Sequence, residues 1–358
     1  MIFRWKEKKL PSLNLKKSIF MLPYRDNTGY HMTKIIFTAT AGKLDFYLED
    51  YASNLAACGN EVHFVPLATF NRKPFYRFWE GKETFKYRKL EECLSAEKAD
   101  ILICNFSTLR FDFAHIRSFF KGKIVLYDME GPNFKAFEDP SCFREVDLVV
   151  TVSRIMAKIL QEKGVNAVYI PHGVECSRFH TVSLAEKDEI FRRKAIFIGR
   201  PSPHRRELCR DLLANGCDLT LYGKRWQEEG PPFAAAAPIG ENVTGEALLK
   251  AVSGAKFAVN ILQDQFVEWK TLMNLQLFFY GALGCPLLTE FVEELPDCFE
   301  EGREMNFFRN REELLEKAEK MEKDPDTALM GQRAKERILK EHTLGHRAAL
   351  FHKYLKGL

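Results

Sequence analysis

The sequence lacks any Cys-x-x-Cys pair, although it contains nine cysteines in 358 residues. Nine is an odd number and the cysteines are scattered along the chain, so neither a zinc framework nor a disulfide framework is visible. Reduced thiols without partners are typical of cytosolic proteins. We therefore predict a cytoplasmic protein, and we predict no metal ligands.

A strong charge of one sign is also lacking, because 53 Lys and Arg residues face 49 Asp and Glu residues. The small excess is concentrated in residues 1–31, which hold seven bases and two acids, so the rest of the chain is electrically balanced. A nucleic-acid-binding domain normally carries a clear basic excess on one face. We predict no nucleic-acid partner.

The basic segment 1–31 has no apolar stretch of seven residues ahead of a small-residue cleavage site, so it is not a good secretory signal. Two interpretations stay open. The segment is either a disordered leader ahead of a true start at Met32, which we favour, or an arm whose Phe3 and Trp5 touch anionic lipid. The second interpretation would place the protein at the inner face of the membrane, as a peripheral contact.

Uninterrupted hydrophobic runs of membrane-spanning length are absent as well. The nearest approach is the mostly apolar stretch of 18 residues from Thr271 to Leu288, which Asn274, Gln276, two glycines and Pro286 interrupt. We predict a buried helix that ends near Ala282, followed by a strand over residues 286–289.

Residues 194–226 predict a strand, a helix and a second strand. The apolar run 195–198 ends at a Gly-Arg turn, leucines at helical spacing follow, and the second buried strand, 218–222, ends at a Gly-Lys pair. Ligands bind beyond the carboxyl ends of parallel strands, and glycines, cations and a helix N-terminus suit a diphosphate there. The candidates are Gly199, Arg200, Arg205, Arg206, Gly223 and Lys224. A solvated helix face is the alternative for each arginine.

The first half of the chain alternates in the same way. Strands are predicted over residues 33–39, 61–67, 100–106 and 123–128, with a helix over 45–58, which is typical of a parallel sheet. The last of these strands ends in a run that contains Asp128 and Glu130. Two carboxylates at a strand's carboxyl end are candidates for a general base, and capping of a helix or loop is the alternative.

Residues 145–179 predict a strand, a helix with Ser153 as its N-cap and Gly164 as its stop, and another strand that leads to a turn. The polar segment 180–193 is a plausible linker between domains. The predicted organisation is an extension, 1–31, a first domain, 32–179, a linker, 180–193, a second domain, 194–340, and a C-terminal helix, 341–358.

This succession resembles a GT-B glycosyltransferase, and residues 145–179 carry the most specific part of the resemblance. The residues that match the superfamily's run into the domain linker are Asp147, Ser153, Gly164, Pro171, Gly173, Val174 and Phe179, with Glu175 in place of the usual aspartate. The chain looks most similar to the CgeB-like, spore-maturation-type branch. The supporting segments are 199–208, 221–226, 255–260 and 273–290, together with His342, Thr343 and Arg347.

The resemblance implies an α/β fold of two Rossmann-like domains that face each other across a cleft, with the C-terminal helix crossing back to the first domain. It implies a nucleotide-sugar donor on the C-terminal half and a surface-polysaccharide, lipid-linked or protein acceptor on the N-terminal half, with no metal and no cofactor. Arg200 and Arg205 or Arg206 would contact the donor diphosphate, and Asn274 would lie near it at a helix N-terminus. Asp128 or Glu130 would be the acceptor-side base.

One position departs from the pattern. Related enzymes carry a glutamate that often holds the donor ribose, where this chain has Phe279, and Gln276 stands where an arginine is common. Glu268 or Glu290 could substitute for that glutamate. The alternatives to a transferase are a degenerate protein of this fold that binds a nucleotide or a partner without turnover and, third, a sugar-nucleotide epimerase.

Overall fold

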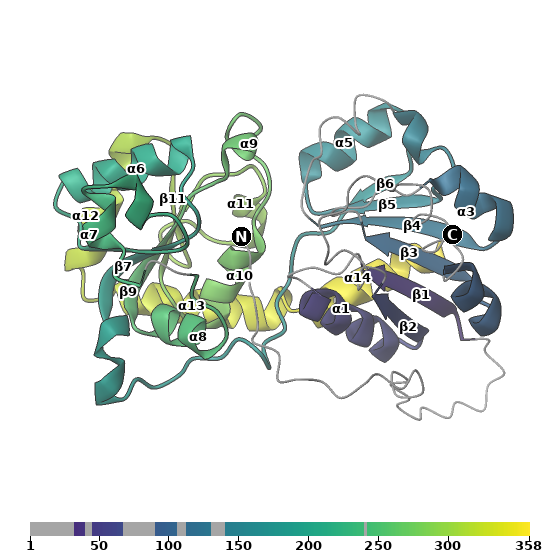
Figure 1. The fold of residues 1–358 in the computed structure, drawn as a ribbon, viewed down its shortest axis with the longest axis horizontal. Coiled ribbons are helices and arrows are strands. Elements are labelled where there is room, and N and C mark those ends of the chain that lie inside the picture. Colours follow the sequence, from purple (N-terminus) through teal and green to yellow (C-terminus); the bar gives the residue numbers. More distant parts are fainter. Residues whose placement is uncertain (1–31, 40–44, 67–89, 106–111, 130–139, 240–241) are drawn as a thin grey trace. The chain divides into compact units, whose positions relative to one another are not determined.

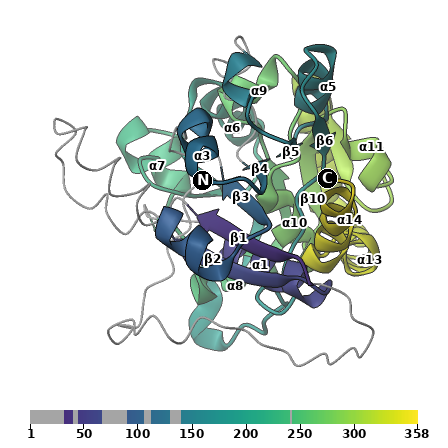
Figure 2. The same cartoon turned by 90° about the vertical axis from the view of Figure 1, so that its right-hand side faces the viewer.

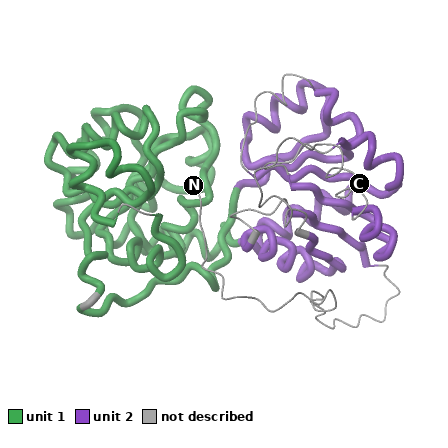
Figure 3. The backbone as a smooth tube through the Cα atoms, viewed as in Figure 1, with its two compact units in different colours: residues 1–7, 172–343 green, residues 8–171, 344–358 purple. Residues whose placement is uncertain are grey.

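The computed structural model describes residues 32–39, 45–66, 90–105, 112–129, 140–239 and 242–358. They divide into two compact units, shown in Figure 3. The C-terminal unit is His172–Thr343, and the N-terminal unit comprises the described residues up to Pro171 together with Leu344–Leu358. The predicted extension 1–31 and the candidate base Glu130 lie outside the described residues.

Six described strands form one parallel sheet in the N-terminal unit, in the order β2-β1-β3-β4-β5-β6 (Figure 1). Strands β3 and β5 are buried at every position. Their sequences are nearly continuously apolar, which is typical of strands that are covered on both faces. The strands are β1 Lys34–Ala39, β2 Glu61–Pro66, β3 Ile101–Asn105, β4 Lys123–Asp128, β5 Leu148–Thr151 and β6 Ala167–Tyr169.

Helices cover both faces of this sheet. Residues of α3, Phe113–Phe119, and α5, Arg154–Glu162, share one hydrophobic cluster with side chains of β3 and β4. The other face is covered by α1, Asp45–Ala57, and by α14, Leu344–Lys356, which returns from the end of the chain to lie against α1 (Figures 1 and 2). The expectation that the C-terminal helix crosses back to the first domain is confirmed.

The C-terminal unit holds a second parallel sheet, whose five described strands have the order β11-β10-β9-β7-β8. Its core gathers apolar side chains such as Phe197, Leu221 and Phe257 between the sheet and the helices. The strands are β7 Arg193–Ile198, β8 Leu219–Tyr222, β9 Ala255–Asn260, β10 Leu287–Glu290 and β11 Asn306–Phe308.

The helices of this unit follow local signals in the sequence. Pro203 opens α6, Pro203–Ala214, because a proline is tolerated in the first turn, and Gly216 with φ +82° follows its end. The apolar run predicted as a buried helix is α10, Leu275–Ala282, buried at every position. The remaining helices include α8 Glu246–Ser253, α9 Asp264–Val267, α11 Leu295–Cys298, α12 Arg311–Lys323 and α13 Thr327–Glu341.

The segment predicted as a linker, 180–193, packs on the C-terminal unit. It contains a 3-10 helix, η2 Glu186–Phe191, and the Asp188 carboxylate accepts from the Ala185 N–H and pairs with Lys250 of α8 at 2.9 Å. In the same segment, ahead of η2, the Thr181 hydroxyl donates to the Leu283 carbonyl at 2.7 Å. In the part of the chain that the structure describes, none of the helices has both the length and the hydrophobicity that crossing a membrane requires.

Candidate functional site

The carboxyl ends of β7, β8, β9 and β10 lie at one edge of the C-terminal sheet, because all four strands run parallel. Gly199 follows β7 and Gly223 follows β8. The Gly199 N–H donates to the Tyr222 carbonyl at 2.8 Å, and a Cβ on Gly223, where φ is +150°, would meet the Gly199 oxygen at 2.1 Å. Glycine is therefore required at 223 for the two loops to approach each other at the strand ends, where ligands bind in such sheets.

Arg205 of α6 is buried, contrary to the alternative of a solvated helix face. Its Nε donates to the Ile261 and Leu262 carbonyls at 3.2 and 3.1 Å, and Nη2 donates to Ile261 at 3.0 Å. Burial lowers the pKa of its guanidinium, and within the described part of the chain no carboxylate lies at ion-pair distance from it. Arg205 thus fixes the loop after β9 and leaves a positive charge beneath it.

The other predicted cations have different surroundings. Arg200 and Lys224 are exposed and follow the ends of β7 and β8. The Arg206 guanidinium instead pairs with the Glu229 carboxylate, with Nη1 and Oε1 2.9 Å apart. The structure therefore brings Arg200 and Lys224 to the same edge as the two glycines, and it holds Arg206 against an acid.

Asn274 is the N-cap of α10. This agrees with its predicted position at a helix N-terminus. Its Oδ1 accepts from the Leu277 N–H at 3.1 Å, and its Nδ2 donates to Asn260 Oδ1 at 2.9 Å. Asn260, which ends β9, in turn donates to the Thr289 hydroxyl of β10 at 2.9 Å. This chain of amides fixes the start of α10 beside the strand ends. Asn260 was not predicted, although a polar residue closing an apolar strand is a signal for it.

Glu290 ends β10 and is held by two groups. The His204 Nε2 of α6 lies 2.9 and 3.0 Å from its two oxygens, and the Leu262 N–H donates to it at 2.9 Å. The hydrogen bond with Glu290 raises the pKa of His204. His204, missed at the sequence level, adjoins the predicted arginines in the first turn of α6. The pair lines a cavity of about 200 Å³ with Lys270, Arg309 and Arg311.

Phe279 belongs to the buried core of the C-terminal unit. It is buried on α10 and stacks on Phe179, with ring centroids 3.8 Å apart and planes inclined by 10°. Gln276, one turn earlier, is buried as well, and its Nε2 donates to the Ile198 carbonyl at 2.8 Å. Related enzymes often have a glutamate and an arginine at these two positions. Here Phe279 packs in the core of the C-terminal unit, and Gln276 hydrogen-bonds to its backbone.

Asp128, the described candidate base, ends β4 in the N-terminal unit. It is buried, and its Oδ2 accepts a hydrogen bond from the Thr151 hydroxyl of the neighbouring β5 at 3.0 Å. Parallel register sets Asp128 opposite Thr151, so the contact follows from the strand pairing. The position at a strand's carboxyl end is the one predicted.

Known proteins resemble this chain in part of its sequence and in its fold. Residues 200–353 match a family model described as glycosyl transferase-like, and no curated protein sequence matches the chain. A sucrose-phosphate synthase from Thermosynechococcus elongatus is similar in structure, with 15% identity, a TM-score of 0.67 and coverage of 91% of this chain and 98% of that one. Anabaena HepE, solved with UDP and glucose, has 13% identity, a TM-score of 0.61 and coverage of 92% and 100%.

A glycosyltransferase from Rickettsia africae is similar as well, with 12% identity, a TM-score of 0.63 and coverage of 92% of this chain and 99% of that one. At such identities the likeness establishes the fold, which is the two-sheet α/β architecture of GT-B glycosyltransferases. The predicted fold class is thus confirmed, and residues 200–353 are similar to glycosyl transferase-like domains. Membership of the CgeB-like branch stays a prediction.

Proposed function

We propose that this protein is a glycosyltransferase that moves a sugar from a nucleotide-sugar donor to an acceptor without a metal ion. The observation that carries the proposal is the edge of the C-terminal sheet, where the loops of Gly199 and Gly223 meet beside two exposed cations and the capped start of α10. A family model for glycosyl transferase-like domains matches residues 200–353, most of which lie in this unit, and HepE, of similar fold, was solved with UDP and glucose.

In this proposal Arg200 and Lys224 hold the donor diphosphate and stabilise the negative charge that grows on it as the glycosidic bond breaks. Arg205 acts through the loop after β9, because its guanidinium is committed to the carbonyls of residues 261 and 262. Asp128 is the proposed acceptor-side base. The acceptor is a surface polysaccharide, a lipid-linked glycan or a protein, met in the cytoplasm or at the inner face of the membrane.

Thermal unfolding with UDP, GDP, ADP, CMP and dTDP, each with EDTA and with Mg²⁺, tests the donor site. A nucleotide at about 100 times its dissociation constant adds roughly 2.7 kcal/mol to the free energy of unfolding. We expect one nucleotide to raise the melting temperature in EDTA and Arg200→Ala to weaken that effect. Arg333→Ala, an exposed arginine on α13, is the matched control. Failure of every nucleotide to shift the transition would contradict the donor site.

A second candidate is a protein that binds a nucleotide without turnover. Phe279 favours it, since a buried ring stacked on Phe179 cannot accept the hydrogen bonds that the glutamate of related enzymes accepts from the ribose hydroxyls. Of the two substitutes that the sequence offers, Glu290 is already bonded to His204 and to the Leu262 N–H, and Glu268 is exposed. Release of nucleotide from a donor sugar, with a glycosylated product, supports the transferase; tight binding without release supports the second candidate.

A further inference from the structure

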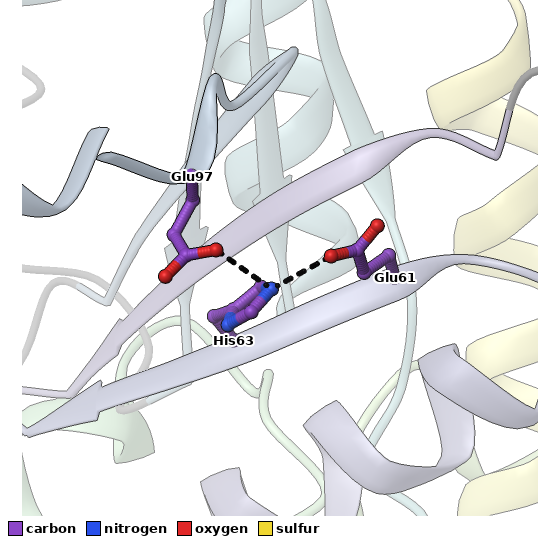
Figure 4. Close-up of side chains that lie close together, drawn as sticks. All are labelled: Glu61, His63 and Glu97. Carbon is purple, nitrogen blue, oxygen red and sulfur yellow. Dashed lines mark hydrogen bonds and ion pairs between the residues drawn. The ribbon is translucent and has the colours of Figure 1, made fainter. Parts of the chain in front are cut away.

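A cluster of three ligand-type side chains lies in the N-terminal unit, away from the donor site. Glu61 and His63 stand two residues apart on β2, so both side chains leave the same face of the strand. Glu97 comes from the helical residues 90–97, which precede β3. Figure 4 shows both carboxylates directed at one ring nitrogen of His63, and the three donor atoms lie within 4.8 Å of one another.

The ring nitrogen of His63 has two carboxylate oxygens near it, and the contact with Glu61 is a long hydrogen bond. The His63 Nε2 is 3.2 Å from Glu61 Oε1 and 3.4 Å from Glu97 Oε2, whereas charge-assisted hydrogen bonds of this kind are usually near ~2.8 Å. One Nε2–H can be directed at only one of the two oxygens. Two carboxylates thus converge on an atom that can supply a single proton.

The same distances suit a tetrahedral metal ion. Zinc binds imidazole nitrogen and carboxylate oxygen at about 2.0 to 2.2 Å, which places neighbouring ligand atoms of a tetrahedron roughly 3.4 Å apart. The separations of 3.2 and 3.4 Å match two edges of that tetrahedron. We propose that Glu61, His63 and Glu97 form a divalent-metal site for zinc or a zinc-like ion, with water as the fourth ligand.

Position and charge define the role of this site. Glu61 is the first residue of β2 and pairs in register with Lys34, the first residue of β1, so the cluster lies at the amino end of the sheet. Ligands of such sheets bind at the opposite, carboxyl end. Lys34 Nζ lies 3.6 Å from Glu61 Oε2, which leaves Oε1 for the metal. The ion would tie the edge strand β2 to the helical residues before β3, and it would take no part in transfer.

Titration with Zn²⁺ and Co²⁺ after chelator treatment tests the site in the full chain. We expect one equivalent of metal to be lost, or its affinity to fall at least about ten-fold, in His63→Ala and in Glu97→Gln. His180→Ala, an exposed histidine in the other unit, is the control and should keep the wild-type stoichiometry. Circular dichroism and melting of the metal-free variants check that they fold.

Cobalt separates this site from the free cysteines, because thiolate ligands give an intense charge-transfer absorption that nitrogen and oxygen ligands do not. A cobalt spectrum without that band, sensitive to His63→Ala, supports the proposal. Binding that is equal in His63→Ala, Glu97→Gln and His180→Ala overturns it, as does binding that shows only the thiolate band. Neither result bears on nucleotide binding by the C-terminal unit.

Discussion

Arg205 shows how one side chain can combine a positive charge with a structural task. Its guanidinium bonds to two carbonyls after β9 and lies over the Phe197 ring, with Cζ 5.5 Å from the ring centroid. An alanine, which has no side-chain donor, could not satisfy those carbonyls. The burial of Arg205 therefore predicts a loss of stability on its replacement that an arginine on a solvated helix face would not show.

We expect Arg205→Ala to lower the free energy of unfolding by about 2 to 4 kcal/mol, because two carbonyls lose their donor. Arg206→Ala, next to it, loses a partly exposed ion pair with Glu229 and should cost at most about 1 kcal/mol. Urea unfolding of the two variants checks the difference. Equal stabilities would show that the carbonyl contacts contribute little.

The His204–Glu290 pair predicts a pH dependence of stability. Its hydrogen bond raises the folded-state pKa of His204 above the unfolded value, near ~6.5. The stabilisation is therefore complete below the unfolded pKa and is lost as pH rises through the folded pKa. We expect the stability difference between wild type and His204→Gln to be larger at about pH 5.5 than at about pH 9. His180→Gln, an exposed histidine, should show no such trend.

At the scale of elements, α14 is the clearest case of a helix whose place depends on distant partners. Phe351 lies 5.9 Å from Tyr51 of α1 and 5.9 Å from Tyr127 of β4, measured between ring centroids. Asn60, just after α1, is 3.0 Å from the His352 ring. The end of the chain thus closes the core of the unit formed by its beginning.

Phe351→Ala should destabilise the N-terminal unit by about 3 to 5 kcal/mol, the usual cost of removing a buried phenylalanine ring. Tyr354→Ala, on the exposed side of the same helix, should change stability by less than about 0.5 kcal/mol. Chemical unfolding followed by far-ultraviolet circular dichroism measures both. A small loss in Phe351→Ala would mean that α14 docks only loosely.

At the scale of the whole molecule, the two sheets carry proposed sites of different chemistry. The donor site uses the carboxyl ends of strands in the C-terminal unit, and the metal site uses the amino end of β2 in the N-terminal unit. Hydrogen exchange can therefore distinguish nucleotide binding at the donor site from metal binding at the metal site.

We expect a bound nucleotide to slow amide exchange in the loops after β7 and β9 and at the start of α10. Zinc should slow exchange in β2 and the end of the helical residues 90–97. The measurement is exchange followed by mass spectrometry, with each ligand added alone. A nucleotide effect confined to the N-terminal unit would contradict the donor assignment, and a zinc effect absent from β2 would contradict the metal site.

Local signals in the sequence predict most of the helices and strands of this protein. Apolar runs bounded by glycine, caps such as Ser153 and Asn274, and the alternation of strand and helix are local signals, and the structure bears out the two parallel sheets that they predicted. Local signals suffice because hydrogen bonding and side-chain periodicity within an element involve residues close in sequence.

Which distant side chains are in contact depends on the tertiary structure. Arg205 turns inward to residues 261 and 262, His204 finds Glu290, and Glu97 reaches His63, although each pair is far apart in the chain. Such contacts depend on strand order, register and helix placement, which arise when distant elements bury their apolar faces together. A charged residue in the sequence therefore indicates which interactions its side chain can make. The fold determines whether that charge faces a ligand, an acidic side chain or the core.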